Sequence, residues 1–198
     1  MGLSVAMEDK EAKTLDLMLF FIQKLDGALG RTKLIKLCYL TDMFHRMTAG
    51  KPVTNFQYKL FENGPFDARF YGVVNALEQA GFIQETFVPE FNGHRYSILK
   101  TKDPRDFVLS REERYVSERV AERFGKVPLD ILLDEVVYRT EPAKQAREAG
   151  AVKEPLDMDQ VNNRLKNDLG LDFETYLAAK EAQARDERVP IEDIINSL

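Results

Sequence analysis

The sequence predicts a mainly α-helical (α+β) fold: a helical domain with a small antiparallel β-sheet and a winged-helix-like hairpin, followed by a C-terminal helical extension. Three observations predict this fold. Apolar residues recur at helical spacing in several segments, one short segment alternates with a period of two, and the pair Asn92-Gly93 separates two strand-like runs. We expect residues 1–150 to form the domain and residues 151–198 to form an acidic helical extension.

The composition is sufficient for one core without disulfides or metals, because 198 residues with 44% hydrophobic content can bury a sizeable interior. The net charge of −5 is unevenly spread: residues 1–107 contain 14 basic and 13 acidic side chains, and residues 108–198 contain 14 and 20. A mildly acidic chain argues against non-specific nucleic-acid binding, which needs clustered Lys and Arg. A local basic patch stays compatible with this charge.

The N-terminal region lacks the features of a targeting or membrane segment. The apolar run 17–22 is far shorter than the roughly 20 residues that cross a bilayer. Glu8, Asp9 and Glu11 precede it, where a signal peptide would be basic. The single cysteine, Cys38, excludes an intrachain disulfide and is interpreted as a buried thiol in a reducing compartment. We therefore expect a cytoplasmic protein with no membrane partner.

The first two predicted helices form a hairpin. Apolar residues at helical spacing predict one helix over residues 10–26 and a second over residues 31–48. Glycines at positions 27 and 30 separate them, and the Gly-Lys-Pro segment 50–52 ends the second helix. Two helices joined by so short a connection are expected to pack against each other.

A strand, a helix and a β-hairpin are predicted next. Residues 55–61 alternate as in a half-buried strand, which Asn63-Gly64-Pro65 is expected to stop. An amphipathic helix follows Pro65 and closes at Gly81. Residues 82–91 and 94–99 then form the strands of the hairpin, and a helix followed by a hairpin is a winged-helix arrangement.

The remaining segments are predicted to be helical. Ser110 and Glu113 form a capping box that begins a helix to about Phe124, and Pro128 begins another helix that carries the apolar stripe 129–137. Beyond residue 150, weaker amphipathic helices are predicted at three places, over residues 158–169, 173–184 and 191–198.

A search for catalytic and metal-binding residues favours none. Cys38 and His45 are two helical turns apart, about 10 Å along the axis, too far for a nucleophile and its base. His45 is interpreted as a packing residue and His94 as an exposed residue of the hairpin; neither has metal-ligand spacing. The pairs Asp134-Glu135 and Glu112-Glu113 are interpreted as solvated helix faces. We expect no enzyme activity, no cofactor and no metal.

Basic residues offer a weaker signal for DNA. Arg31, Lys33 and Lys36 cluster at the start of the second helix and are candidate phosphate contacts. The helix before the hairpin would enter the major groove, but its expected outward side chains include only one cation and two acids. These outward side chains are Asp67, Arg69, Tyr71, Asn75, Glu78 and Gln79. DNA binding is therefore possible but not favoured.

Several motifs of the chain resemble the Panacea domain, the SocA-like antitoxin family. Residues 32–42 (TKLIKLCYLTD) and the Gly-Lys-Pro turn at 50–52 resemble its opening helix and turn. The likeness continues, more weakly at its end, over roughly residues 14–150, through Tyr58, Gly64-Pro65-Phe66, Tyr71, Gly81, Ile83, residues 132–140, Pro142 and Ala146. The chain departs from the family pattern at Cys38, at residues 67–69 and in lacking the family's Trp. We expect structural roles for the motif residues Leu37, Tyr39, Gly64, Pro65 and Phe66.

The resemblance implies an antitoxin that neutralises a cognate toxin protein, either by direct binding or as a proteolytic adaptor. The toxin would be the partner, with a protease or chaperone as a further candidate, and genes of this family often lie beside toxin genes or in prophages. We expect the third helix and the hairpin to form the contact surface, through Arg69, Tyr71, Asn75 and Arg95.

The alternative is a winged-helix transcriptional regulator that binds DNA in a salt-sensitive manner. Its phosphate contacts would be Arg31, Lys33, Lys36, Arg69 and Arg95. The sequence leaves open which toxin is bound, whether proteolysis takes part, the oligomeric state and the role of residues 151–198.

Overall fold

The computed structural model describes residues 2–25, 29–91, 94–102 and 107–159. Several predicted elements lie outside these residues: the helices over 173–184 and 191–198, most of the helix over 158–169, and the hairpin turn Asn92-Gly93. The described part confirms the predicted fold class, since it is mainly α-helical with small antiparallel β-hairpins. Within it, no helix has the length and apolar character needed to cross a membrane.

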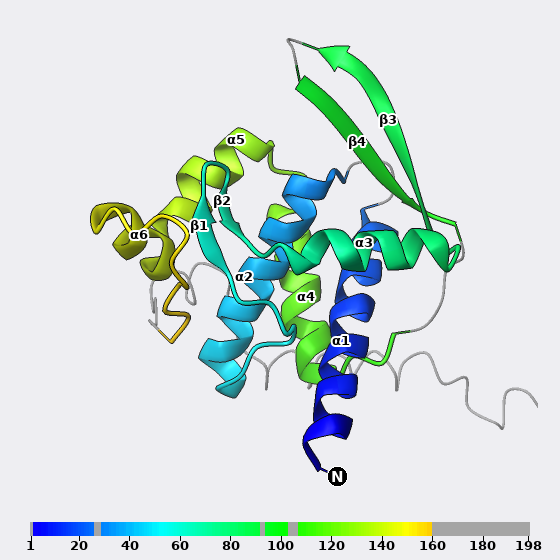
Figure 1. The fold of residues 1–198 in the computed structure, drawn as a ribbon, viewed down its shortest axis with the longest axis horizontal. Helices are drawn as coiled ribbons and strands as arrows, with labels where there is room; N and C mark the ends of the chain where they lie inside the picture. Colours follow the sequence, from blue (N-terminus) through cyan, green and yellow to red (C-terminus); the bar gives the residue numbers. More distant parts are fainter. Residues whose placement is uncertain (1, 26–28, 92–93, 103–106, 160–198) are drawn as a thin grey trace, which may run out of the picture.

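Three long helices form the core of the fold (Figure 1): α1 (Gly2–Lys24), α2 (Arg31–Ala49) and α4 (Arg111–Phe124). Helix α2 contacts both of the others and is buried without interruption from Leu34 to His45. Helix α1 begins at Gly2 instead of residue 10, because the residues before 10 lack the periodic apolar pattern from which a helix is read. Helix α2 ends as predicted, at Gly50 in the left-handed conformation (φ 71°).

A short β-hairpin follows α2. Strand β1 (Lys59–Phe61) pairs antiparallel with β2 (Gly64–Phe66). The prediction of one strand over 55–61, stopped at Gly64-Pro65, is wrong, because residues 53–57 bond to buried side chains instead of a neighbouring strand and Pro65 lies within β2. Proline is tolerated there because β2 is an edge strand with no ladder partner on its outer side.

Residues 152–156, here called the strap, pack along the other side of β1. The Lys153 N–H donates to the Leu60 carbonyl (2.9 Å), and the Leu156 N–H donates to the Tyr58 carbonyl (2.8 Å). Pro155 forms an antiparallel bridge with Lys59, and Leu156 is buried in the core. Hydrogen bonds therefore cross the domain boundary that the sequence predicts at residue 150.

Helix α3 (Arg69–Gln79) leads into the larger hairpin, β3 (Ile83–Phe91) and β4 (His94–Thr101). The turn between α3 and β3 contains Gly81 at φ 78°, as the sequence predicts. Figure 1 shows the hairpin projecting from the helical body, and the Leu99 N–H donates to the Leu29 carbonyl at its base. A wing-like role for this hairpin in DNA binding stays a prediction.

The predicted capping box of α4 is confirmed, since the Glu113 N–H donates to the Ser110 hydroxyl and the Ser110 N–H donates to the Glu113 carboxylate. The helical segment predicted from Pro128 over the apolar stripe 129–137 is confirmed, although it is not one regular α-helix. The chain there forms α5 (Leu129–Ile131), a π-helical turn, a 3-10 turn and then α6 (Glu141–Glu148). Pro142 in the first turn of α6 suits the start of a new helix, because proline lacks the N–H that would go unused there.

Candidate functional site

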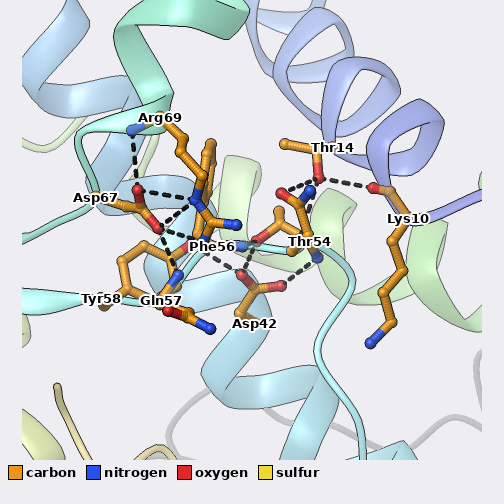
Figure 2. Close-up of polar contacts among 10 residues, drawn as sticks. Lys10, Thr14, Asp42, Thr54, Phe56, Gln57, Tyr58, Asp67 and Arg69 are labelled. Atoms are coloured by element: carbon orange, nitrogen blue, oxygen red, sulfur yellow. Dashed lines mark hydrogen bonds and ion pairs between the residues drawn. The ribbon is translucent and has the colours of Figure 1, made fainter. Parts of the chain in front are cut away.

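A buried carboxylate fixes the loop between α2 and β1 (Figure 2). Asp42 accepts the backbone N–H of Val53 and of Thr54, both at 2.8 Å, and the hydroxyls of Thr54 and Tyr58. Burial raises the pKa of Asp42, and these four hydrogen bonds to the carboxylate oppose the rise. Asp42 therefore anchors the loop and the Tyr58 ring from within the core.

A second carboxylate joins the same loop to α3 (Figure 2). Asp67 accepts the Gln57 N–H at 2.6 Å and the Arg69 N–H at 2.9 Å, and it pairs with the Arg69 guanidinium. Burial acts to raise the pKa of Asp67, but the bonds from Arg69 and Gln57 outweigh it and lower the pKa. The expectation that Asp67 points outward is wrong, because its side chain is needed at the loop junction.

A groove of about 610 Å³ lies beside this framework. Four segments wall it: the start of α2, the β1–β2 hairpin, the start of α3 and the strap. Its lining residues are Arg31, Thr32, Ile35, Lys36, Phe61, Glu62, Asn63, Gly64, Phe66, Phe70, Tyr71, Val152 and Lys153. The volume is within the range of sites that hold small ligands or a few residues of a peptide.

Four aromatic rings, Phe66 and three that contact it, line the groove. The Phe66 ring lies 5.6 Å from Phe61, 6.3 Å from Phe70 and 5.2 Å from Tyr71, between ring centroids. Phe70 is buried, whereas Tyr71 is 49% exposed at the mouth of the groove. The expectation that Tyr71 points outward is confirmed, and its side chain is available to a partner.

Lys36 lines the groove from α2 and is only 1% exposed. Its ammonium donates to the Pro65 carbonyl at 2.6 Å, and among the described residues no carboxylate pairs with it. Burial lowers the pKa of Lys36 to about 7. The prediction of a solvated, phosphate-contacting Lys36 is wrong, because the Gly64-Pro65 turn covers the side chain.

Gly64 makes that cover possible. Its φ of 83° is left-handed, and a Cβ built on it would lie 3.3 Å from Leu133 Cδ2 and 3.5 Å from Lys36 Cε. A side chain would strain the backbone and press on both neighbours. Glycine at position 64 therefore lets the chain pass close to Lys36, so that the Pro65 carbonyl can accept a hydrogen bond from the Lys36 ammonium.

Arg31 ties the groove to the large hairpin. Its Nε donates to the Glu85 carboxylate of β3 at 2.6 Å, and its Nη2 donates to the same carboxylate. Its guanidinium carbon lies 5.6 Å from the Tyr71 ring centroid. The bidentate pair and the cation–π contact hold Arg31 in place. Its charge is thereby offset within the molecule.

The strap supplies the last wall. Val152 is 57% exposed, and Lys153 holds a left-handed φ of 68°, a conformation that costs a non-glycine residue about 1 kcal/mol. Both side chains line the groove, although they lie some 80 residues beyond the aromatic rings in the chain.

The groove gathers a part of the residues that the sequence singles out. Arg31, Lys36, Gly64, Phe66 and Tyr71 line it, and Pro65 provides the acceptor for Lys36. Among the other candidates, Leu37 and Tyr39 are core residues, Lys33, Arg69 and Asn75 lie outside the lining, and the Arg95 side chain falls outside the described part.

Sequence reasoning missed Phe61, Val152 and Lys153. A signal for the burial of Lys36 was present, because Tyr39 and Leu40 follow it at helical spacing and place it on the apolar stripe of α2. No sequence pattern predicts that the strap lines the groove, because its position depends on backbone pairing with β1.

The remaining reactive side chains have packing roles. Cys38 is buried as predicted, and burial raises the pKa of its thiol. His45 is buried with Nδ1 2.7 Å from the Lys51 carbonyl oxygen. The prediction that Glu113 is solvated is wrong, because it caps α4 and accepts from Lys13 at 2.7 Å. No three His, Cys, Asp or Glu residues of the described segments are grouped to hold a metal.

The family comparison settles the relationship that these motifs indicate. The family model described as antitoxin SocA-like, Panacea domain, matches residues 34–137. The chain belongs to this family. The match supports an antitoxin-like role, and it spans the aromatic rings and Lys36 but not Arg31 or the strap. No curated protein and no solved structure matches the chain.

Proposed function

We propose that this Panacea protein neutralises a cognate toxin by binding it directly, and that the toxin contacts the groove and the adjoining start of α3. The observation that carries the proposal is the exposed Tyr71 ring at the mouth of an aromatic-lined groove. Large aromatic side chains in such positions supply much of the binding energy of protein interfaces. Membership of an antitoxin family makes a toxin the expected partner.

The charges of the same region argue against the DNA-binding alternative. Of the five cations it requires, Arg31 is paired with Glu85, Arg69 is paired with Asp67, and Lys36 is buried. Cations that are already offset gain little from phosphate, since counterion release needs free positive charge. This leaves Lys33 and Arg95, fewer cations than a duplex contact usually employs.

We further propose a binding role without catalysis. The thiol of Cys38 is held in the core, and the imidazole of His45 is engaged by a backbone carbonyl in the core. Neither group lines the groove, which would have to hold a substrate.

The test is co-expression of this chain with the product of its neighbouring gene, with colony survival as the readout. The structure offers two matched variants, because Val152 in the groove and Val108 outside its lining are both exposed valines, at 57% and 73%. Glutamate at either position is expected to change stability by only about 0.5 kcal/mol. We expect Val152→Glu and Tyr71→Ala to lower survival about tenfold or more, and Val108→Glu to rescue like the wild type.

Two results would contradict the proposal. A neighbour that is harmless when expressed alone contradicts neutralisation of that partner, and equal rescue by both valine variants contradicts the groove as the contact surface. If rescue is lost in a strain that lacks its cytoplasmic proteases, the protein acts by delivering the toxin to a protease and not by direct neutralisation.

A further inference from the structure

Phe87 is an exposed apolar residue on the face of the large hairpin that packs against the helical body. Along β3, the side chains of Ile83, Glu85 and Phe87 share this face, because alternate residues of a strand point the same way and the register with β4 is unbroken from Ile83 to Val88. Near the base the face is covered, since Ile83 and the Glu85 side chain are each 2% exposed. Phe87, two residues further out, is 66% exposed. The face therefore continues beyond the part that the body covers.

The Arg31–Glu85 ion pair connects Phe87 to the groove. Arg31 lines the groove and lies against the Tyr71 ring at its mouth, with 5.6 Å between the guanidinium carbon and the ring centroid. Glu85 is one same-face step from Phe87, a distance of about 7 Å along a strand. Figure 1 shows β3 and the β1–β2 hairpin on opposite sides of the start of α2. Tyr71 and Phe87 are thus two exposed rings of one surface, joined by a charge pair.

The charges of this surface cancel. Arg31 is offset by Glu85, and Lys36 is covered by the turn at 64–65 and bonded to a backbone carbonyl. The other ionisable groups of the groove lining are Lys153 and Glu62, one of each sign. A balanced lining complements neither an acidic nor a basic ligand, and a charged side chain pressed against the rings would lose its hydration without gaining a counter-charge. Apolar side chains are therefore the contacts that this surface favours.

The described strands that line the groove offer no free edge to an added strand. Strand β1 is bonded on one side to β2 and on the other side to the strap. In β2, Pro65 is the residue whose backbone points away from β1, because its carbonyl accepts the Lys36 ammonium. Proline has no N–H, so the ladder that strand addition requires cannot form there. Recognition then depends on side chains, as when an amphipathic helix places its apolar face in a groove.

We propose that the groove and Phe87 together receive the apolar face of an amphipathic helix of the toxin. Uncharged side chains on successive turns of that helix would cover Tyr71, Val152 and Phe87, which are 49%, 57% and 66% exposed. Charged residues of the helix would stay on its opposite, solvent-facing side. The inference rests on the proposed function, because it names the kind of toxin segment that is bound, and it extends the contact surface from the groove onto β3.

Two glutamate substitutions on β3 test this extension in the co-expression assay. Phe87→Glu places a charge where the helix would pack, and Thr86→Glu places the same charge on the opposite, exposed face of the same strand. We expect Phe87→Glu to lower colony survival about tenfold or more and Thr86→Glu to rescue like the wild type. Phe87→Leu keeps an apolar side chain and should rescue, which separates a loss of contact from a loss of folding.

Peptides test the chemistry of the bound segment. Overlapping peptides of about 20 residues, which together cover the product of the neighbouring gene, are titrated against the full chain by fluorescence anisotropy. We expect one region to bind and to gain helical circular dichroism on binding. Its affinity should stay within about threefold between about 0.05 and about 0.5 M NaCl, because salt screens only charged contacts.

A neutral dye tests the surface without the toxin. Nile red is uncharged and fluoresces more strongly on apolar surfaces, so its binding to the chain alone reports exposed apolar area. We expect Tyr71→Ala and Phe87→Glu each to reduce the bound fluorescence about twofold and Thr86→Glu to leave it unchanged.

The outcomes separate this inference from the proposed function. If Tyr71→Ala abolishes rescue while Phe87→Glu and Thr86→Glu rescue equally, neutralisation through the groove stands and this inference fails. A bound peptide that gains no helix, or an affinity that falls more than about tenfold over the same salt range, would also overturn it. A harmless neighbour contradicts the proposed function for that partner, and dye binding that is insensitive to Phe87→Glu would then overturn this inference as well.

Discussion

Two buried charges on the same helix have opposite surroundings. Asp42 and Lys36 lie on α2 and are 0% and 1% exposed. Asp42 accepts four hydrogen bonds from the loop after α2, whereas the described structure gives Lys36 one backbone carbonyl and no counter-charge. Fully satisfied buried charges hold a fold together, and a buried charge left without a counter-ion weakens it. The difference indicates that Asp42 stabilises the fold, whereas the burial of Lys36 carries a desolvation cost that one backbone carbonyl does not offset.

The largest expected effect comes from removing Asp42. Asp42→Ala leaves two backbone N–H groups and the hydroxyls of Thr54 and Tyr58 without their acceptor, so we expect the free energy of unfolding to fall by about 4 kcal/mol. Urea denaturation followed by circular dichroism measures this change. A loss below about 1 kcal/mol would remove Asp42 from the framework of the fold.

Removing the charge of Lys36 is expected to stabilise the protein, the opposite of the effect expected for Asp42. Lys36→Met keeps the aliphatic volume and deletes an uncompensated ammonium, and we expect the free energy of unfolding at neutral pH to rise by about 2 kcal/mol. The same denaturation experiment measures it. If Lys36→Met is less stable than the wild type, Lys36 stabilises the fold as Asp42 does, and the two charges do not differ in this respect.

The pH dependence of that gain sharpens the comparison. The folded-state pKa of Lys36, about 7, lies below its ordinary value of 10.5. Between these values the unfolded chain binds more protons than the folded one, so this group makes the wild type more stable as the pH rises, by up to about 1.4 kcal/mol per unit. We therefore expect the advantage of Lys36→Met to shrink between about pH 7 and about pH 9, and a constant advantage would contradict it.

Glu113 is an intermediate case and has the smallest expected effect. Burial acts to raise the pKa of Glu113, but Lys13 and the Ser110 N–H outweigh it, so the pKa lies below its ordinary value of 4.5. Its stabilising charge is present above that value and is lost as the pH falls through the folded-state pKa. Glu113→Gln is expected to lower stability by about 1 kcal/mol at neutral pH, and the difference should vanish once the pH falls below the lowered folded-state pKa of Glu113. A difference independent of pH would assign the effect to capping alone.

The sequence predicts those parts of the fold that local chemistry determines. The periodic apolar stripe of α2, the Ser110–Glu113 capping box and the left-handed Gly50 and Gly81 all occur where expected. Each depends on residues within a few positions of one another. The same is true of the β3–β4 hairpin, whose strands flank one Asn-Gly pair.

The candidate site was predictable only in part, because long-range contacts create it. Lys36, Asp67 and Glu113 are charged residues whose type predicts exposure, yet each is buried by a segment distant in the chain or by a loop turn. The strap was missed because an irregular segment pairs with β1 only in the folded chain. The sequence selects Tyr71 as a contact residue, but it does not predict that Tyr71 lies at the mouth of a groove.

The strap also bears on how such antitoxins could diversify. The family match ends at residue 137, so the floor of the groove belongs to the shared domain while Val152 and Lys153 do not. Two backbone hydrogen bonds, from Lys153 and Leu156, hold this wall, and they are indifferent to the side chains that it carries. On the proposed function, substitutions at Val152 and Lys153 would change which toxin is bound while leaving the shared core intact, whereas Leu156 of the same strap belongs to the core.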